Sequence, residues 1–390
     1  MADTFPLQCE RKKIQDRYRG CLLGGAVGDA LGAPVEFMSR AEIQAHFGAG
    51  GIQEYVPAFG RVGAITDDTQ MTLFTAEGLL RSWARDFSHD PKAIPGEMAM
   101  AYQRWLCTQG VKHQMHDHCL QGALIEHEEL FARRAPGLTC LSGLQGMAEK
   151  DDVAKNDSKG CGGVMRVAPI GMYFARLAQY QNAKPAALMR KAFALGCRAA
   201  AITHGHPTGQ LASGTFVVIL LELLNGTPLD PAIDSALRVL AAHEYNAETS
   251  RAIGQARRLA TERPHDAEAL AQLGAGWVAE EALAIAVYCA LSAPDLRSGV
   301  VLAVNHGGDS DSTGSMAGQL LGAMYGATAI PRSWLDSLEL HPLIAAMADD
   351  LAAYVTWDAT GDAAQENART PRHEHKTDAL EYGGSWRNSG

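Results

Sequence analysis

The sequence predicts an all-α protein. Four segments are rich in alanine and leucine and lack the alternation of period two that half-buried strands show, and a fifth has the spacing of an amphipathic helix. Runs of β-branched residues are short, and the best strand candidate, 215–221, has flanks that favour a helix. The chain has 390 residues and 47% hydrophobic content, enough for a substantial core in one large domain or several smaller ones. The predicted helical segments are 69–83, 186–201, 209–224, 277–292 and 316–326.

The first of these segments, 69–83, carries its large apolar side chains between positions 71 and 80 and its charges to one side, as an amphipathic helix does. Polar turns separate the later segments. Pro136–Gly137 forms one such turn, and the loop 151–163 forms a longer one. The spacing of segments and turns is typical of an α-bundle.

Glycine recurs at every fourth residue in two places. On a helix this spacing makes a smooth stripe that lets another backbone approach closely, despite a cost of about 1 kcal/mol per glycine relative to alanine. We therefore expect the two stripes to pack together in the centre of the domain. Flexible glycine-rich loops are the alternative, which the apolar residues between the glycines disfavour. The stripes are Gly20, Gly24, Gly28 and Gly32, and Gly314, Gly318 and Gly322.

Composition sets a polar C-terminal tail (357–390) apart from the main domain (16–356), which residues 1–15 precede as an N-terminal extension. The formal charge of −10 argues against nucleic acid or an anionic membrane as the main partner. The N-terminus lacks an apolar signal region, and the apolar stretch 21–35 is interrupted by Asp29. The eight scattered cysteines, without a C-x-x-C pair, indicate reduced thiols and a cytoplasmic location.

Two acidic blocks carry the strongest chemical signal. Thr66-Asp67-Asp68-Thr69 precedes the amphipathic helix, and Gly307-Gly308-Asp309-Ser310-Asp311-Ser312-Thr313 precedes the second glycine stripe. Neighbouring carboxylates repel one another unless a cation lies between them, and a helix N-terminus supplies only about half a positive charge. The blocks therefore suggest hard divalent cations with oxygen ligands.

Each block also has an ordinary interpretation. Asp and Thr before a helix are common N-caps, and Asp309-Ser310-Asp311 alone is typical of a solvated turn. A cap uses one side chain, however, whereas each block offers several. The occurrence of both blocks in one chain favours a metal site. No histidine or cysteine set completes a zinc site, although His306 lies nearby in the sequence.

Six strings occur in the order seen in the ADP-ribosylglycohydrolase family, of the dinitrogenase-reductase-activating type, which this sequence resembles between about residues 16 and 326. The paired TDDT and GGDSDS blocks and the GDALG-x-x-x-E start are the specific part of the resemblance. The strings are DRYRGCLLGGAVGDALGAPVEF, GAITDDTQM, SKGCGGVMRVAPIG, ITHGHP, GAGWVAEEALAIA and NHGGDSDSTGSMAGQLLGAMYG.

The resemblance implies a compact orthogonal helical bundle with a dinuclear metal cleft that holds two Mg²⁺ or Mn²⁺ ions. It implies that Glu36 and Asp311 are catalytic, with Glu36 positioning or protonating the reacting group. A surface or helix-ending glutamate is the alternative for Glu36. Many members have Thr where this chain has Ser312, which keeps the hydroxyl oxygen. The implied metal ligands are Thr66, Asp67, Asp68, Asp309, Asp311 and Ser312.

A glycine-rich loop, 156–163, offers backbone N–H groups that can wrap a phosphate. The family often has Asn where Cys161 stands. The alternatives are a plain turn for this loop, helix-end packing for His204 and a core position for Trp277. Asp117, among three histidines at 113, 116 and 118, lies roughly where some members carry a catalytic aspartate. The substrate-binding residues implied by the resemblance are Ser158, Gly160, Gly162, Gly163, Arg166, His204, Trp277 and Glu281.

The implied reaction is attack of water at the anomeric carbon of the distal ribose, which releases ADP-ribose and the unmodified acceptor. The partner is then an ADP-ribosylated protein or a small ADP-ribose conjugate. The segment 309–312 favours arginine as the acceptor, with serine, esters and poly(ADP-ribose) open. Residues 1–13 could form an arm that binds an ADP-ribosylating toxin, as in an immunity protein. A different dinuclear magnesium phosphohydrolase and a non-catalytic ADP-ribose-binding protein are the competing hypotheses.

Overall fold

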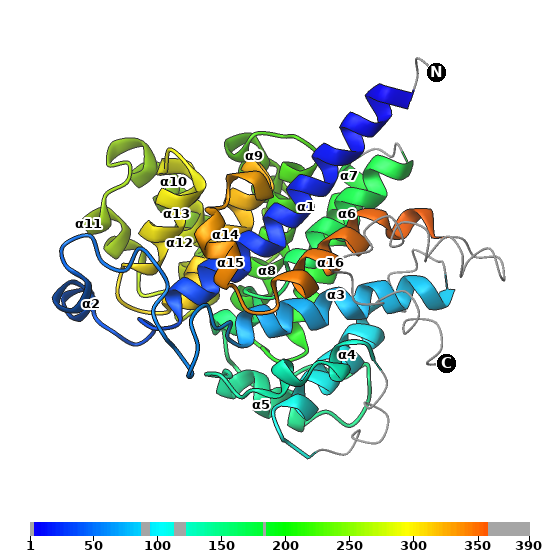
Figure 1. Cartoon of the computed structure of the whole chain (residues 1–390). Coiled ribbons are helices and arrows are strands. Elements are labelled where there is room, and N and C mark those ends of the chain that lie inside the picture. The colour runs from blue at the N-terminus through cyan, green and yellow to red at the C-terminus, as the bar shows by residue number, and fades with distance from the viewer. Residues whose placement is uncertain (1–3, 87–93, 113–121, 182–184, 358–390) are drawn as a thin grey trace.

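The structure, a computed structural model, describes residues 4–86, 94–112, 122–181 and 185–357. These residues form helices joined by loops, and no β-strand occurs among them, which confirms the all-α prediction (Figure 1). The helices are α1 (Thr4–Gly32), α2 (Arg40–Phe47), α3 (Asp67–Asp86), α4 (Ile94–Thr108), α5 (Leu138–Gln145), α6 (Ala168–Gln181), α7 (Pro185–Ala201), α8 (Pro207–Leu224), α9 (Leu229–Leu240), α10 (Ala247–Glu262), α11 (Ala267–Leu270), α12 (Ala279–Ser292), α13 (Leu296–Val304), α14 (Ser310–Tyr325), α15 (Arg332–Ser337) and α16 (His341–Ala353).

Each predicted helical segment lies within or almost within one observed helix, with errors of a few residues at the ends. The predicted segment 316–326 began too late, since α14 starts at Ser310, inside the acidic block. The strand candidate 215–221 lies within α8 and is helical, as its flanks predicted. Of the described residues, α8 alone is long and apolar enough to cross a membrane, and 89% of it is buried inside the protein.

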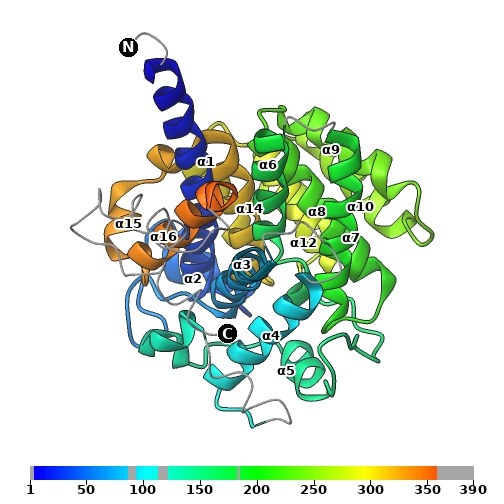
Figure 2. The ribbon, with the colours of Figure 1, turned by 90° about the vertical axis from the view of Figure 1, so that its right-hand side faces the viewer.

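Helices α1 and α14 lie side by side at the centre of the molecule, antiparallel to each other (Figures 1 and 2). Their glycines face one another. A Cβ atom at Gly24 would overlap the carbonyl of Gly318, and one at Gly28 would overlap the carbonyl of Gly314. This close approach confirms the predicted packing of the two stripes. It also places the C-terminal end of α1 against the N-terminal end of α14.

The predicted boundary at residue 16 does not coincide with a break in the structure. Helix α1 runs without interruption from Thr4, and its first turns project from the body (Figure 1). Gln15 already contacts the body, because its side-chain amide donates to the carboxylate of Asp349 on α16. The cluster around Asp117 and the tail from residue 358 onward lie outside the described residues.

Candidate metal centre

Three helix ends converge where α1 meets α14. The turn after α1 carries Glu36, the first turn of α14 carries Asp311, and α3 starts with Asp67. The positions of these helix ends follow from nearby residues, since α1 ends at Gly32 and the two acidic blocks lie at the starts of α3 and α14. The antiparallel α1–α14 pair brings Glu36 and Asp311 to the same end of the bundle.

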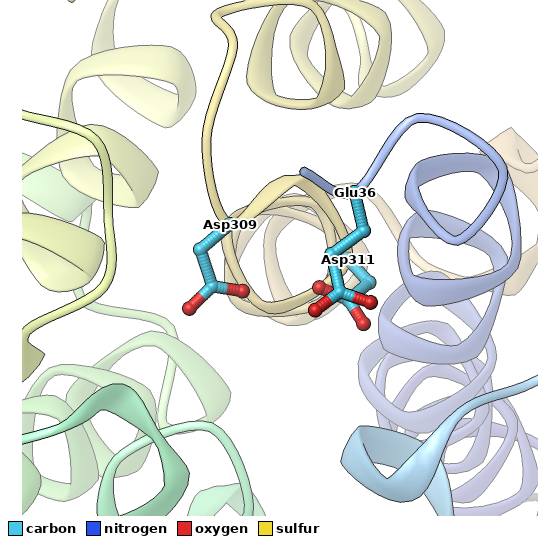
Figure 3. A group of neighbouring side chains, drawn as sticks. All are labelled: Glu36, Asp309 and Asp311. Atoms are coloured by element: carbon cyan, nitrogen blue, oxygen red, sulfur yellow. The ribbon is translucent and has the colours of Figure 1, made fainter. Parts of the chain in front are cut away.

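The carboxylates of Glu36, Asp309 and Asp311 form a tight group, with one oxygen from each lying within 4.8 Å of the others (Figure 3). Their side chains point to the same side of α14. Ligand oxygens around one divalent cation lie about 2.0–2.6 Å from it, so a single cation can contact all three. Asp309 and Asp311 are buried, and Glu36 is half-buried.

Burial raises the pKa of every carboxyl group in this centre, and the charge of Asp311 raises the pKa values of the others further. Burial first, and then the charge of Asp311, raises the pKa of Glu36 to about 10. The same two causes raise the pKa values of Asp67 and Asp68 well above their usual value. The two blocks lie at the starts of α3 and α14, which are in contact, and the charge of Asp311 is a cause of both shifts in the first block.

The donor set fits a hard divalent cation. None of the ion pairs formed among the described residues involves these carboxylates, so no Lys or Arg side chain neutralises them there. Asp68 is 2% exposed, and its Oδ1 atom has no hydrogen-bond partner. A buried acceptor without a donor is costly, and a bound cation would satisfy it. All six residues predicted as ligands offer oxygen, the donor that Mg²⁺ and Mn²⁺ prefer.

Asp29 organises the first acidic block, although the sequence analysis gave it no functional role. Its fully buried carboxylate accepts hydrogen bonds from the backbone N–H groups of Thr66 and Thr69, at 3.0 and 3.1 Å. It also accepts from both threonine hydroxyls. Burial and Asp311 raise the pKa of Asp29 to about 7. An aspartate inside an apolar, glycine-striped helix was the signal that could have identified it.

A second carboxylate holds the same block from the other side. Glu339, which is 1% exposed, accepts from the backbone N–H of Ile65 at 3.1 Å and pairs with Arg134. Arg134 in turn donates to the carbonyl of Ile65 at 3.1 Å. The start of α3 is thus fixed between Asp29 and the Arg134–Glu339 pair. No local pattern marks that pair in the sequence.

The glycine-rich loop pairs with the segment around Trp277. Cys161 N–H donates to the carbonyl of Trp277 at 3.1 Å, and Ala279 N–H donates to the carbonyl of Lys159 at 2.9 Å. An isolated bridge joins Gly160 to the residue between them, 278. The structure therefore places next to each other two of the segments that the sequence analysis assigned to the ligand.

The Trp277 segment rests on the metal centre. Asp309 N–H donates to the carbonyl of Ala275 at 2.9 Å. The carboxylate of Glu281 accepts from the backbone N–H groups of Ala275 and Gly276, at 3.1 and 3.2 Å. Glu281, predicted to bind substrate, is therefore occupied in shaping the loop that carries Trp277.

Trp277 stacks on Phe37 at the surface beside Glu36. Their ring centroids are 5.2 Å apart and the rings are inclined by 19°. Phe37 is 72% exposed and Trp277 is 40% exposed, so Trp277 is not a core residue. Phe37 also has φ of 67°, which is uncommon outside glycine. The sequence analysis missed Phe37, whose position next to Glu36 was its only signal.

Arg166 and His204 lie beneath the glycine-rich loop. Arg166 is completely buried and donates to the Thr203 hydroxyl at 2.7 Å and to the Ala199 carbonyl at 3.0 Å. The guanidinium of Arg166 thus lies in the core, and its predicted part in substrate binding stays a prediction. Burial lowers the pKa of His204 to about 3, so its imidazole is neutral. Its contact with Thr203 agrees with helix-end packing, the alternative that the sequence analysis gave for His204.

The remaining predicted ligand residues lie in the loop itself. Ser158 is half-buried, and its hydroxyl accepts from Gly160 N–H at 3.3 Å. Gly162 and Gly163 are buried against the ring of His204. A side chain at Gly162 would overlap Cys140. The loop is thus kept free of side-chain bulk by the residues under it.

Cys161 is the one side chain of this loop that reaches the metal centre. Its Sγ atom donates to Oδ2 of Asp309 at 2.6 Å. Ser312 Oγ donates to the same sulfur at 3.7 Å. Burial, followed by the charge of Asp309, raises the pKa of the Cys161 thiol well above its usual value. Cys161 is a free thiol, as are Cys21, Cys140, Cys197 and Cys289, in agreement with the predicted reduced thiols.

Comparison with known proteins shows the family of this chain. The family model described as ADP-ribosylglycohydrolase matches residues 10–360. The chain is 28% identical to the ADP-ribosyl-[dinitrogen reductase] glycohydrolase of Rhodospirillum rubrum, over 84% of this chain and 92% of that protein. It is 27% identical to ADP-ribosylhydrolase ARH3 of Bos taurus, over 83% and 88%. It is 23% identical to ADP-ribosylarginine hydrolase Tri1 of Serratia proteamaculans, over 90% and 82%.

The fold is also that of a solved structure. A chain described as an ADP-ribosylglycohydrolase-related protein complex superposes with a TM-score of 0.61 and 27% sequence identity. The match covers 88% of this chain and 99% of that chain. The similarity therefore extends over nearly the whole helical domain, including the segments that form the acidic centre.

Proposed function

The chain belongs to the ADP-ribosylglycohydrolase family, whose members hydrolyse ADP-ribosyl bonds, and from this premise we propose that it removes ADP-ribose from modified arginine in a reaction that depends on two Mg²⁺ or Mn²⁺ ions. One observation carries the proposal. The carboxylates of Glu36, Asp309 and Asp311 lie within 4.8 Å of one another, and Asp311 acts on the acidic block at the start of α3.

Thr66, Asp67, Asp68, Asp309, Asp311 and Ser312 would hold the cations. Bound there, the cations would supply Lewis-acid polarisation of the ribose hydroxyls and would activate the attacking water. The protein's part is to fix these oxygens before substrate arrives. Asp29 holds Thr66 and Thr69 of the first block, and Glu339 holds Ile65, the residue before it.

Glu36 is placed to handle the proton of the reaction. Hydrolysis joins the oxygen of water to the anomeric carbon, breaks the bond to the leaving nitrogen and delivers a proton to that nitrogen. Glu36 is half-buried, its carboxylate lies within 4.8 Å of those of Asp309 and Asp311, and burial followed by the charge of Asp311 raises its pKa. Its carboxyl oxygen can therefore hold and pass on that proton.

Arginine as the acceptor is supported by the surroundings of Glu36. A guanidinium is cationic and planar, so it is attracted by carboxylates and stacks on aromatic rings. Phe37 and Trp277 present a stacked, exposed aromatic pair next to Glu36. The similarity to a protein named ADP-ribosylarginine hydrolase supports the same acceptor.

The test is incubation of the purified protein with an ADP-ribosyl-arginine peptide, with and without EDTA, and identification of the products by mass spectrometry. We expect ADP-ribose and the unmodified peptide, loss of turnover in EDTA and recovery with excess Mg²⁺. Matched ADP-ribosyl-serine and phosphoserine peptides serve as comparisons. Faster cleavage of the serine conjugate would show that serine, and not arginine, is the preferred acceptor. Release of phosphate alone, or turnover that EDTA does not affect, would overturn the proposed hydrolase.

A further inference from the structure

A cavity of about 700 Å³ lies where the C-terminal ends of α6, α8 and α14 meet the first part of α1 (Figure 2). Its walls include Asp16 on α1 and Tyr325, the last residue of α14, whereas the acidic centre lies at the opposite ends of these two helices. At 1.5 Å per residue, the helix from Asp16 to Gly32 spans about 24 Å. The cavity is therefore separate from the metal centre.

Positive charge gathers at this cavity, although the chain as a whole has a formal charge of −10. In the described part of the chain, none of the four cationic side chains in its wall forms an ion pair. The one acidic side chain, Asp16, accepts from the backbone N–H and the hydroxyl of Thr328, at 3.2 and 3.3 Å. The four cations are Arg11, Lys13, Arg17 and Arg176.

The helix ends around the cavity account for part of this charge. A helix C-terminus carries about half a negative charge, so three of them and Asp16 offer about two and a half negative charges to four cations. Arg17 Nη1 donates to the carbonyl of Leu223 at 3.4 Å, and Arg176 Nε donates to the carbonyl of Ala352 at 2.5 Å. A guanidinium has five N–H groups, so both arginines keep donors for a ligand. The cations therefore exceed what the helix ends require.

The uncharged part of the wall is suited to a flat ring. Tyr325 is 41% exposed, and Leu224 beside it in the wall is buried. Gln179 Nε2 donates to the carbonyl of Leu224 at 3.1 Å, whereas its Oε1 is buried without a hydrogen-bond partner. A buried acceptor of this kind is satisfied by an N–H donor such as a ring amino group. Aromatic side chains stack on nucleobases, and arginines bind phosphates.

We propose that this cavity is a second ligand site that binds a nucleoside diphosphate with an amino-bearing base. Arg11, Lys13, Arg17 and Arg176 hold the two phosphates, and Tyr325 stacks on the base, whose amino group donates to Oε1 of Gln179. The volume lies within the range of about 300–1,000 Å³ that small-molecule sites have. The site goes beyond the proposed function, because it shares no residue with the metal centre.

The test is calorimetric titration of ADP into the full-length protein with Mg²⁺ in excess. Lys13→Glu is compared with Lys191→Glu on α7, since both lysines are exposed and neither forms an ion pair among the described residues. We expect Lys13→Glu to raise the Kd for ADP about tenfold or more, because it reverses a charge beside two phosphates. Lys191→Glu should leave the Kd unchanged. Arg17→Gln is a second variant and should also raise it about tenfold.

A Kd that neither Lys13→Glu nor Arg17→Gln changes would overturn the inference. Asp311→Ala should retain ADP binding, and its loss there would place ADP at the metal centre instead. Adenosine and pyrophosphate, titrated separately, should each bind more weakly than ADP. Equal affinity for pyrophosphate and ADP, or an unchanged Kd for ADP in Tyr325→Ala, would contradict the contact with the base. These readouts need no substrate, so ADP binding here together with no cleavage of ADP-ribosyl bonds would refute the proposed function alone.

Discussion

The carboxylate of Asp29, in the last turn of α1, accepts hydrogen bonds from both the backbone N–H and the hydroxyl of Thr66, at 3.0 and 2.8 Å. It ties the central helix to the first acidic block. We expect Asp29→Asn to lower Mg²⁺ affinity by about 10- to 100-fold, because the amide NH₂ would face N–H donors and displace the ligands. Calorimetry checks this, with Asp349→Asn in the peripheral contact to Gln15 as the control. Equal affinities would show that Thr66 does not depend on Asp29.

Removal of one predicted metal ligand from each acidic block tests whether the two blocks form one metal centre. Asp67→Ala and Asp311→Ala should each reduce turnover of the ADP-ribosyl-arginine peptide to below about 1% of the wild-type rate, while the far-ultraviolet circular dichroism stays helical. The exposed Asp336→Ala on α15 is the matched control and should retain activity. Substantial activity in either ligand variant would refute the assignment of the metal centre.

The contact between α1 and α14 predicts a large effect of a single methyl group. Gly24→Ala would drive a Cβ into the carbonyl of Gly318, so we expect a loss of about 1–3 kcal/mol or more in the free energy of unfolding. Gly254→Ala on α10 is the control, because its Cβ would meet nothing within 4 Å. Helix propensity predicts a gain of up to about 1 kcal/mol there. Urea denaturation measures both. Similar values for the two variants would contradict the packing argument.

The aromatic pair of Phe37 and Trp277 beside Glu36 predicts different effects of substitution on KM and on kcat. Trp277→Ala should raise KM several-fold and change kcat less, because stacking holds the substrate without taking part in bond cleavage. Mg²⁺ affinity should stay unchanged. Tyr245→Ala, which removes another exposed aromatic ring, serves as the control in steady-state kinetics. A fall in kcat with constant KM would assign Trp277 to the reaction itself.

The raised pKa values predict how stability depends on pH when metal is removed. A carboxyl with a higher pKa in the folded state binds its proton more tightly there, so its contribution is full below the unfolded pKa and is lost as pH rises through the folded pKa. For Asp29 this window runs from 3.8 to about 7, and Glu36 extends it to about 10. In EDTA, Tm should therefore fall as pH rises across this range.

The control for this prediction is the same scanning calorimetry series with excess Mg²⁺. The cations would offset the repulsion among the carboxylates, so the fall in Tm should become smaller. Identical pH dependence with and without Mg²⁺ would show that the titrating groups do not bind the metal.

Helix formation and the chemistry of each acidic block were readable from the sequence, because both depend on neighbouring residues. The glycine stripes even identified the central helix pair, since a four-residue repeat such as Gly20 to Gly32 makes sense only against another backbone. The contacts that hold the first acidic block in place could not be predicted from the sequence. Asp29 and Glu339 reach Thr66 and Ile65 from distant segments, and no local pattern links them.

The sequence by itself determined the all-α class, the pairing of the two glycine-striped helices and the identity of the carboxylates at the candidate centre. Only the tertiary structure decided that Arg166 turns into the core, that Trp277 stacks on Phe37, and that Cys161 touches Asp309. Helical periodicity and repulsion between adjacent charges act over a few residues, so both can be predicted from short stretches of sequence. Contacts across 148 residues depend on how the loops pack after the helices have assembled.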